Sequence, residues 1–192
     1  MVDPHLLVPA RVLWVLTTAY IANATATLPR GRGPPMDLGR NWPWDGRRLL
    51  GPSKTWAGFL FGPTFAVPFG LLQAYLILIA PPDLALVPQF GVSVLASLPL
   101  VLTLGFGALS GDAIGSFVKR RLGRESGART WALDQLPFIL LPVGIGLVAF
   151  PAVFVPTFAS LEALGWLVVF TLGLHVAFNY IGYWAGWKKV PW

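Results

Sequence analysis

Residues 90–121 read FGVSVLASLPLVLTLGFGALSGDAIGSFVKRR, and residues 90–110 of this stretch carry no charged side chain. A helix of about 20 apolar residues is long enough to cross the roughly 30 Å hydrocarbon core of a bilayer. Asp112 follows almost directly after this run. Because an ionisable group is costly at membrane depth, such a residue is a functional candidate by default. The stretch therefore predicts a membrane-spanning helix with a polar site at its end.

The whole chain has the composition of an integral membrane protein. Its 192 residues are 55% hydrophobic and 11% charged, and the mean hydropathy is +0.66. Soluble domains usually hold about 25% charged residues. The absence of cysteine excludes disulfides, thiolate nucleophiles and cysteine metal sites. We predict an all-α integral membrane protein, a single domain over residues 1–192, with five transmembrane helices at about 6–28, 56–80, 90–118, 136–155 and 161–184.

The basic residues predict the orientation of these spans. Lys and Arg near span ends are retained on the cytoplasmic side of a membrane. All but one of the 14 basic residues lie in the connection 29–55, the connection 119–135 or the C-terminal tail. We therefore place the N-terminus outside, and the C-terminus and both long loops in the cytoplasm of a multi-pass cell-membrane protein. The first span lacks a basic n-region, so we interpret it as a span and not as a signal peptide.

The first long loop combines basic residues with glycine and proline, which allow unusual backbone conformations. Gly46, Gly51 and Pro52 flank its basic positions, so amide groups and cations could converge on an anion. The loop ends at the N-terminus of the second span, and helix N-termini favour phosphate. The alternative is that the cations only bind anionic headgroups and set the topology. The candidate phosphate-binding residues are Arg47, Arg48, Ser53, Lys54 and Thr55.

A second polar cluster surrounds Asp112. On a helix, Asp112, Ser116 and Lys119 fall at i, i+4 and i+7 and share one stripe. Asp134 lies just before the next antiparallel span, so we expect the two carboxylates to face each other at similar depth. Carboxylate oxygens are ligands that Mg²⁺ prefers. The alternative is an internal ion pair of Asp112 with Lys119 or with an arginine.

The sequence lacks the motifs on which several other classes of enzyme depend. The sequence contains no GxSxG, HExxH or GxxxxGK motif, and its two histidines are far apart. A catalytic triad, a zinc hydrolase and a Walker-type nucleotide site are therefore poorly supported. A small transporter that uses Asp112 and Lys119 is a further alternative. It is disfavoured because the second, fourth and fifth spans offer few polar residues for a path through the membrane.

Residues 111–136, GDAIGSFVKRRLGRESGARTWALDQL, resemble the signature of the membrane CTP-dependent cytidylyltransferases, the family of CDP-diacylglycerol synthases. That signature runs GDxxxSxxKRxxxxKD, then a glycine-rich stretch, then LDRxD. Gln135 and Pro137 stand where this pattern has its Arg and its final Asp. The matching positions are Gly111, Asp112, Ser116, Lys119, Arg120, Leu133 and Asp134.

Residues 35–62, PMDLGRNWPWDGRRLLGPSKTWAGFLFG, are similar to the first loop of the archaeal branch of that family, the CDP-archaeol synthases. The pattern of this loop is DGRRxxGxxKTWxGF. The resemblance implies transfer of CMP from CTP to 2,3-di-geranylgeranylglycerol 1-phosphate, a phosphorylated dialkylglycerol, with release of pyrophosphate and a requirement for Mg²⁺. An ester phosphatidic acid is the alternative acceptor. The matching positions are Asp45, Gly46, Arg47, Arg48, Gly51, Lys54, Thr55, Trp56, Gly58 and Phe59.

These motifs give a hypothesis for the site. Asp112 and Asp134 are expected to hold Mg²⁺, with Asp45 as a further candidate, while an oxygen of the lipid phosphate attacks the α-phosphorus of CTP. The second pKa of a phosphate monoester lies near 6, so no strong base is needed. The expected partners are CTP, an isoprenoid ether lipid phosphate entering by a lateral groove, and the bilayer, with no nucleic acid. The catalytic candidates are Asp112, Asp134, Lys119 and Lys54, and those that bind CTP or phosphate are Arg47, Arg48, Ser53, Lys54, Thr55, Ser116, Lys119, Arg120 and Arg124.

Overall fold

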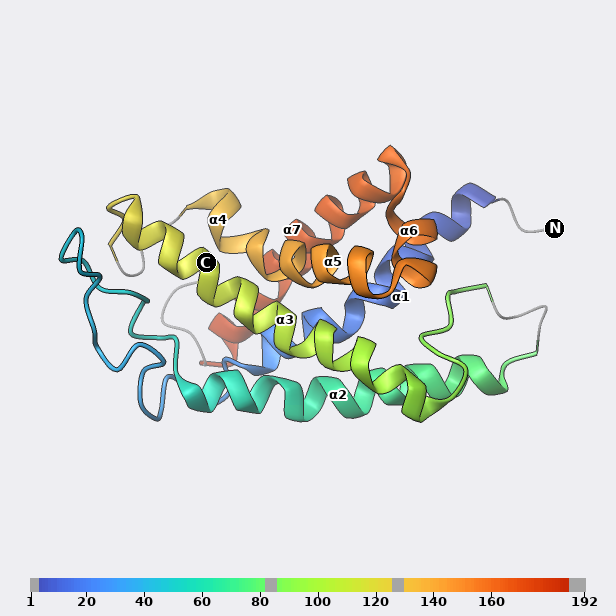
Figure 1. Ribbon diagram of the computed structural model, residues 1–192, viewed down its shortest axis with the longest axis horizontal. Coiled ribbons are helices and arrows are strands. Elements are labelled where there is room, and N and C mark those ends of the chain that lie inside the picture. Colours follow the sequence, from blue (N-terminus) through green and yellow to red (C-terminus); the bar gives the residue numbers. More distant parts are fainter. Residues whose placement is uncertain (1–3, 82–85, 126–129, 187–192) are drawn as a thin grey trace.

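The computed structural model describes residues 4–81, 86–125 and 130–186 as a bundle of helices (Figure 1). The only strand-like pairings among these residues are two isolated bridges, Pro35 with Thr55 and Asn41 with Arg48. Residues 126–129 of the predicted second loop and the basic tail lie outside the described residues. The helices are α1 (Pro4–Thr25), α2 (Trp56–Ile79), α3 (Val94–Arg121), α4 (Trp131–Gln135), α5 (Pro137–Ala149), α6 (Pro151–Phe158) and α7 (Leu161–Trp184).

Four helices, α1, α2, α3 and α7, are long and apolar enough to cross a membrane. Their lengths of 22, 24, 28 and 24 residues give about 33 to 42 Å at 1.5 Å per residue. Ser93 and Ser160 cap α3 and α7 by accepting from the amides of Ala96 and Ala163. The predicted spans agree with these helices, except that α1 ends at Thr25 and α3 begins at Val94.

The span predicted over 136–155 is not one continuous helix. The chain leaves the helical conformation at Phe150, where φ is −133° and ψ is 53°. Pro151 follows, and a proline disfavours the helical conformation of the residue before it. The segment therefore forms two short helices, α5 and α6, of 13 and 8 residues. They follow α4 along the length of the bundle (Figure 1).

The bundle is tightest where α3 meets α5, which are joined through small residues. A Cβ atom added at Gly111 would lie 2.1 Å from the carbonyl oxygen of Pro137, and one at Gly107 would lie 3.0 Å from Cβ of Pro142. Such small residues let two helix backbones approach closely inside a membrane. Gly107 and Gly111 are thus the face on which α5 packs. This contact fixes the α3 residues of the site relative to the segment that follows Thr130.

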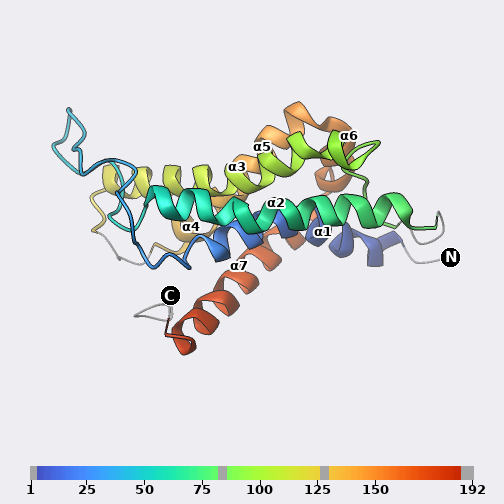
Figure 2. The ribbon, with the colours of Figure 1, turned by 90° about the horizontal axis from the view of Figure 1, so that it is seen from below.

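Helix α7 packs far more loosely than the others. It contacts α1, α4 and α6, and Figure 2 shows it running obliquely out of the bundle towards its C-terminal end. Only 17% of the most apolar 18-residue stretch of α7 is buried within the protein, against 50% of the corresponding stretch of α3. A space is therefore left between the second half of α7 and the ends of the other helices.

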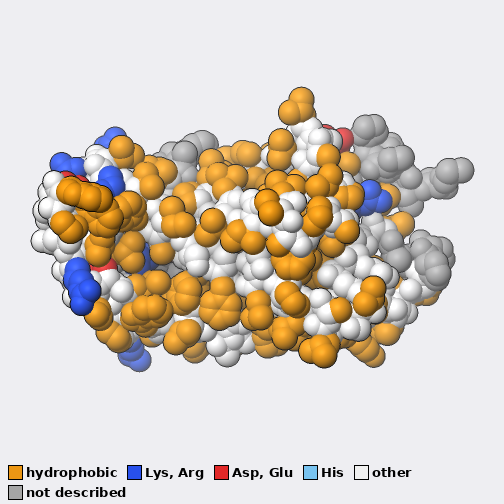
Figure 3. Space-filling model, in the orientation of Figure 1, with side chains coloured by type: hydrophobic (Ala, Val, Ile, Leu, Met, Phe, Trp, Pro, Cys, Tyr) orange, Lys and Arg blue, Asp and Glu red, His pale blue; other side chains and the backbone are white. Residues whose placement is uncertain are grey.

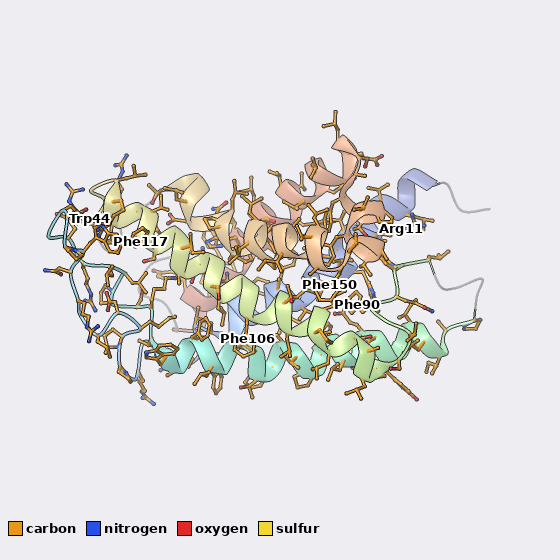
Figure 4. All side chains as sticks on the ribbon, in the orientation of Figure 1. Arg11, Trp44, Phe90, Phe106, Phe117 and Phe150 are labelled. Atoms are coloured by element: carbon orange, nitrogen blue, oxygen red, sulfur yellow. The ribbon has the colours of Figure 1, made fainter. Side chains whose placement is uncertain are left out.

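The charged side chains gather at one end of the molecule. We call this the loop end; it comprises residues 26–55, residues 119–125 and α4. Lys and Arg side chains collect there in the face shown in Figure 3, while apolar side chains cover the length of the bundle. Figure 4 places Trp44 and Phe117 at this end and Arg11 at the opposite one. Arg11 donates from Nε to the carbonyl oxygen of Leu86 at 3.1 Å, which ties α1 to the connection before α3.

Candidate active site

A cavity of about 600 Å³ occupies the loop end, between the second half of α7 and the ends of α1, α2 and α3. One part of its wall is charged and the other part is apolar. The apolar part includes Phe59, Leu109 and Phe138 together with α7 side chains such as Leu174 and Phe178. The charged and hydroxyl side chains that line it and that the sequence singled out are Ser53, Lys54, Thr55, Asp112, Ser116, Lys119, Arg120 and Asp134.

The first ion pair of the cavity joins the first loop to α3. The Nζ atom of Lys54 donates to Oδ2 of Asp112. Lys54 lies two residues before α2, and Asp112 lies about two and a half turns before the end of α3. Their side chains are 23% and 29% exposed, so both remain accessible from the cavity. The alternative to a metal site was an ion pair of Asp112 with Lys119 or an arginine; Asp112 is indeed paired, but its cation is Lys54, from another segment.

The second ion pair joins α3 to α4. Nζ of Lys119 lies 2.6 Å from Oδ1 of Asp134, and their side chains are 15% and 25% exposed. Asp134 also accepts from the backbone N–H of Thr130 at 2.7 Å, which fixes the carboxylate at the start of α4. Lys119 is about 10 Å further along α3 than Asp112, at 1.5 Å per residue. Two lysines and two carboxylates thus line one cavity, and each ammonium is paired with a carboxylate.

The hydroxyl groups of Ser116 and Thr55 hold the backbone around the cavity in place. Ser116 is buried, and its Oγ accepts from the backbone N–H of Gly51 at 2.9 Å, which docks the first loop on α3. Thr55 caps α2 by accepting from the N–H of Gly58 at 3.2 Å, and the N–H of Trp56 is bonded to the carbonyl of Pro34. Two amides at the N-terminus of α2 are therefore already occupied. The predicted phosphate site at this terminus must rely on Lys54 more than on free amides.

Arg120 keeps one donor free beside the cavity. Its Nη2 donates to the carbonyl of Glu125 at 3.0 Å. Its Nε is buried and has no acceptor in the described part of the chain. Because buried donors are normally satisfied, this N–H marks a place where an anion would be favoured.

A different kind of ion pair organises the first loop. Asp37 is buried and accepts from Nε and Nη2 of Arg48 at 3.0 and 3.1 Å. The backbone N–H groups of Gly39 and Leu50 donate to the same carboxylate at 3.0 Å each. Burial by itself raises the pKa of Asp37, but these four hydrogen bonds and the guanidinium charge outweigh it and lower the pKa to about 2. The hydrogen bonds to Asp37 and its negative charge raise the pKa of Arg48.

A fourth pair holds the loop against the end of α3. Nη1 of Arg121 lies 2.7 Å from Oδ1 of Asp45. Nη2 of Arg121 donates to the carbonyl of Arg48 at 2.6 Å, and Nη1 of Arg47 donates to the carbonyl of Arg121 at 3.1 Å. The guanidinium of Arg121 also lies over the ring of Phe117, 5.0 Å from its centroid. These contacts position the loop so that Lys54 reaches Asp112.

The sequence and the fold of this chain are similar to those of known proteins. The family model described as CarS-like, CDP-archaeol synthase, matches residues 5–192. A relative from Thermococcus gammatolerans, a CDP-archaeol synthase, is 42% identical over 180 residues, which cover 94% of this chain and 94% of the relative.

The chain belongs to the CDP-archaeol synthase family.

Further relatives support this membership. The CDP-archaeol synthase of Archaeoglobus fulgidus is 38% identical over 95% of this chain and 97% of its own length, and that of Methanocaldococcus jannaschii is 37% identical over 94% and 95%. A solved structure described as an intramembrane enzyme for archaeal membrane lipids biosynthesis shares 35% identity, with a TM-score of 0.57 over 82% of this chain and 88% of that one. This protein is thus a membrane enzyme with several apolar helices.

Four of the candidates named from the CDP-archaeol synthase motifs are placed elsewhere. Arg47, Arg48 and Asp45 are used in the loop contacts described above, and Arg124 is exposed at the end of α3. None of these four lines the cavity. Asp45, Arg47 and Arg48 hold the first loop, and the basic candidates that line the cavity are Lys54, Lys119 and Arg120.

Several residues of this site were not predicted from the sequence. Asp37, in the stretch MDLGR, escaped notice although an aspartate two residues before a glycine is a common turn signal; Gly39 has a φ of +75°. Gln135, His175 and Asn179 also line the cavity. Nothing in the local sequence shows that α7, some 60 residues beyond Asp112, returns to the same cavity.

Proposed function

We propose that this protein transfers CMP from CTP to an isoprenoid ether lipid phosphate, with release of pyrophosphate, in the cavity at the loop end. The observation that carries the proposal is the pairing of Lys54 with Asp112 and of Lys119 with Asp134 around one cavity that also has an apolar wall. A water-soluble nucleotide needs the charged part. A membrane lipid needs the apolar part.

The paired charges are suited to an exchange of partners. Without substrate, each ammonium neutralises a carboxylate, so the cavity avoids the cost of unpaired buried charge. When a triphosphate enters, Lys54, Lys119 and the free N–H of Arg120 can turn to phosphate oxygens, which accept charge-assisted hydrogen bonds as carboxylates do. Asp112 and Asp134 are then released to bind a cation.

The donor set fits Mg²⁺ as that cation. Mg²⁺ is usually held by one or two carboxylates together with substrate phosphates, and not by a complete protein cage. Asp112 and Asp134 supply two carboxylates on the same cavity, and no group of three or more His, Cys, Asp or Glu residues lies together in the described segments. When bound there, Mg²⁺ would neutralise charge on the phosphates and polarise the α-phosphorus.

The chemical step needs little proton transfer. An oxygen of the lipid phosphate forms a bond to the α-phosphorus of CTP, and the bond from that phosphorus to the bridging oxygen breaks with its electron pair on pyrophosphate. A phosphate monoester is largely a dianion at neutral pH, since its second pKa is near 6. The task of the protein is therefore to align the reactants and stabilise the growing negative charge. Lys54, Lys119 and Arg120 line the cavity and are the candidates for this role.

The oblique course of α7 provides a route for the lipid. The second half of α7 lines the cavity with Leu174 and Phe178, while Val176 and Ile181 are 45% and 49% exposed on the same helix. An isoprenoid chain could lie along these side chains with its phosphate at the two ion pairs. This arrangement agrees with a lateral groove and with a loop end that faces the cytoplasm, where CTP is found.

The test is a transfer assay with purified protein, Mg²⁺ and CTP labelled at the α-phosphorus. Label should enter the lipid phase with the ether lipid phosphate and at a lower rate with an ester phosphatidic acid. Label at the γ-phosphorus should appear only in pyrophosphate. Absence of labelled lipid with both acceptors would overturn the proposal, and faster transfer to the ester would reassign the acceptor.

A further inference from the structure

Gln135 is a polar residue of the cavity that the transfer mechanism does not use. It ends α4, one residue after Asp134, and it is buried with 6% of its surface exposed. Its side chain lines the cavity together with Lys119 and Phe138. The side-chain oxygen, Oε1, has no hydrogen-bond donor anywhere in the described segments.

A buried acceptor without a donor calls for an explanation. More than about nine in ten buried polar atoms in folded proteins are hydrogen-bonded. Both carboxylate oxygens of Asp134, the residue before Gln135, accept hydrogen bonds from Lys119 and Thr130. The side-chain oxygen of Gln135 accepts none in the described segments. Because the unpaired oxygen belongs to a residue that lines the cavity, the missing donor is expected on a ligand.

The chemistry of the proposed substrates limits which ligand can supply it. The ether lipid phosphate offers ether and phosphate oxygens, which accept hydrogen bonds, and pyrophosphate is likewise an acceptor. Cations of the cavity, such as Lys54 and Arg120, suit those groups. Of the two substrates, only the nucleoside part of CTP carries N–H and O–H donors, namely the exocyclic amine of cytosine and the ribose hydroxyls.

We propose that Oε1 of Gln135 accepts a hydrogen bond from the nucleoside of CTP and thereby selects the nucleotide. The inference rests on the proposed function, because it assumes that CTP is bound in this cavity. The adjacency of Gln135 and Asp134 supports it. Lys119 is paired with Asp134, so a nucleotide whose phosphates reach Lys119 lies beside the segment that carries Gln135.

The experiment compares Gln135→Met with the parent protein, since methionine has a similar volume and no amide oxygen. Initial rates are measured with CTP, with the triphosphate of the pyrimidin-2-one riboside, which has hydrogen in place of the amine, and with 2′- and 3′-deoxy-CTP. For the parent, the analogue that lacks the donor should react about tenfold more slowly than CTP. In Gln135→Met, kcat/KM for CTP should fall to the level of that analogue, and KM for the lipid phosphate should not change.

The analogue whose disadvantage disappears identifies the donor as the amine or as one ribose hydroxyl. If Gln135→Met leaves the preference for CTP over every analogue unchanged, or if it changes only KM for the lipid, the inference is overturned. A parent protein that transfers label from no nucleotide would instead refute the proposed function. The two failures are therefore distinguishable.

Thermal unfolding of the nucleotide-free protein separates recognition from a structural role. Because Gln135 has an unsatisfied buried oxygen, an apolar residue should leave the midpoint of unfolding unchanged or raise it, for Gln135→Leu as well as for Gln135→Met. A marked drop in the midpoint in both variants would show that Gln135 stabilises the fold and would contradict the inference. Gln89→Leu is the matched control, because Gln89 is exposed in the connection before α3.

Discussion

Two kinds of ion pair lie within one end of this protein. The cavity pairs, Lys54 with Asp112 and Lys119 with Asp134, use lysines and leave both partners accessible from the cavity. The loop pairs, Arg48 with Asp37 and Arg121 with Asp45, use arginines, and none of these four residues lines the cavity.

The comparison indicates that arginine pairs stabilise the loop, whereas lysine pairs line the cavity where the reaction is proposed to occur. A guanidinium is a planar fork that holds a carboxylate by two parallel bonds, whereas an ammonium is a compact charge that can change partners. Asp37 shows the first use, since it accepts two bonds from Arg48 and two from the backbone. We infer that the loop pairs stay formed during turnover and that the cavity pairs open.

The largest effect is expected from Asp112→Asn. The amide keeps the size of the side chain but loses the charge that is proposed to bind Mg²⁺, so the rate of CMP transfer should fall about a thousandfold or more. The midpoint of unfolding should change by only about 4 °C, because the pair is partly exposed. An active and folded Asp112→Asn protein would refute the proposed metal site.

The next effect is expected from Lys119→Met, which removes a cation proposed to stabilise the leaving pyrophosphate. A fall in kcat of about a hundredfold is expected, with a smaller change in KM for the lipid phosphate. Steady-state kinetics in both substrates measure this. Arg124→Met is the control, since Arg124 is exposed and does not line the cavity. Equal losses of activity in the two variants would mean that Lys119 contributes only to the overall positive charge of the loop end, and not through a specific contact with the substrate.

Breaking a loop pair should lower the stability of the protein and leave the rate of CMP transfer largely unchanged. Asp37→Asn leaves Arg48 without its anion and should lower the free energy of unfolding by about 2 kcal/mol, measured by denaturant unfolding in detergent. Because the pKa of Asp37 is about 2 when folded, against 3.8 for a free side chain, its contribution is complete above pH 4 and is lost as the pH falls from 4 to 2. The parent should therefore lose stability over this window more steeply than Asp37→Asn. Equal pH profiles would contradict the assigned role.

The smallest effect is expected from Asp45→Asn. The pair with Arg121 is 32% exposed on the aspartate side, and exposed pairs contribute about 1 kcal/mol or less. Transfer activity should stay within about threefold of the parent. A loss as large as that of Asp112→Asn would return Asp45 to the metal site proposed from the sequence.

The sequence predicted the helices well where hydropathy alone decides. Span 56–80 agrees with α2 to within one residue, and span 161–184 agrees with α7. It failed at 136–155 because the apolar run is continuous there, while the backbone responds to Pro151 and leaves the helix at Phe150. Hydropathy measures burial in lipid and does not record where a helix breaks.

For the site, the sequence identified several residues that line the cavity but not their partners. The stripe of Asp112, Ser116 and Lys119 left a pair within α3 as an alternative, but residues seven positions apart on a helix are about 10 Å apart along its axis. Lys54 is 58 positions from Asp112 and reaches it only because Ser116 and Arg121 dock the loop on α3. Contacts of this kind depend on tertiary packing, which local spacing does not encode.

The most direct test compares Asp112→Asn with Asp37→Asn in one transfer assay with α-labelled CTP and the ether lipid phosphate, normalised to folded protein. Both replacements remove one carboxylate from an ion pair at the same end of the molecule. Our account predicts that Asp112→Asn incorporates about a thousandth of the parent label or less, while Asp37→Asn stays within about threefold of the parent. Equal rates for the two variants would contradict the division between cavity pairs and loop pairs.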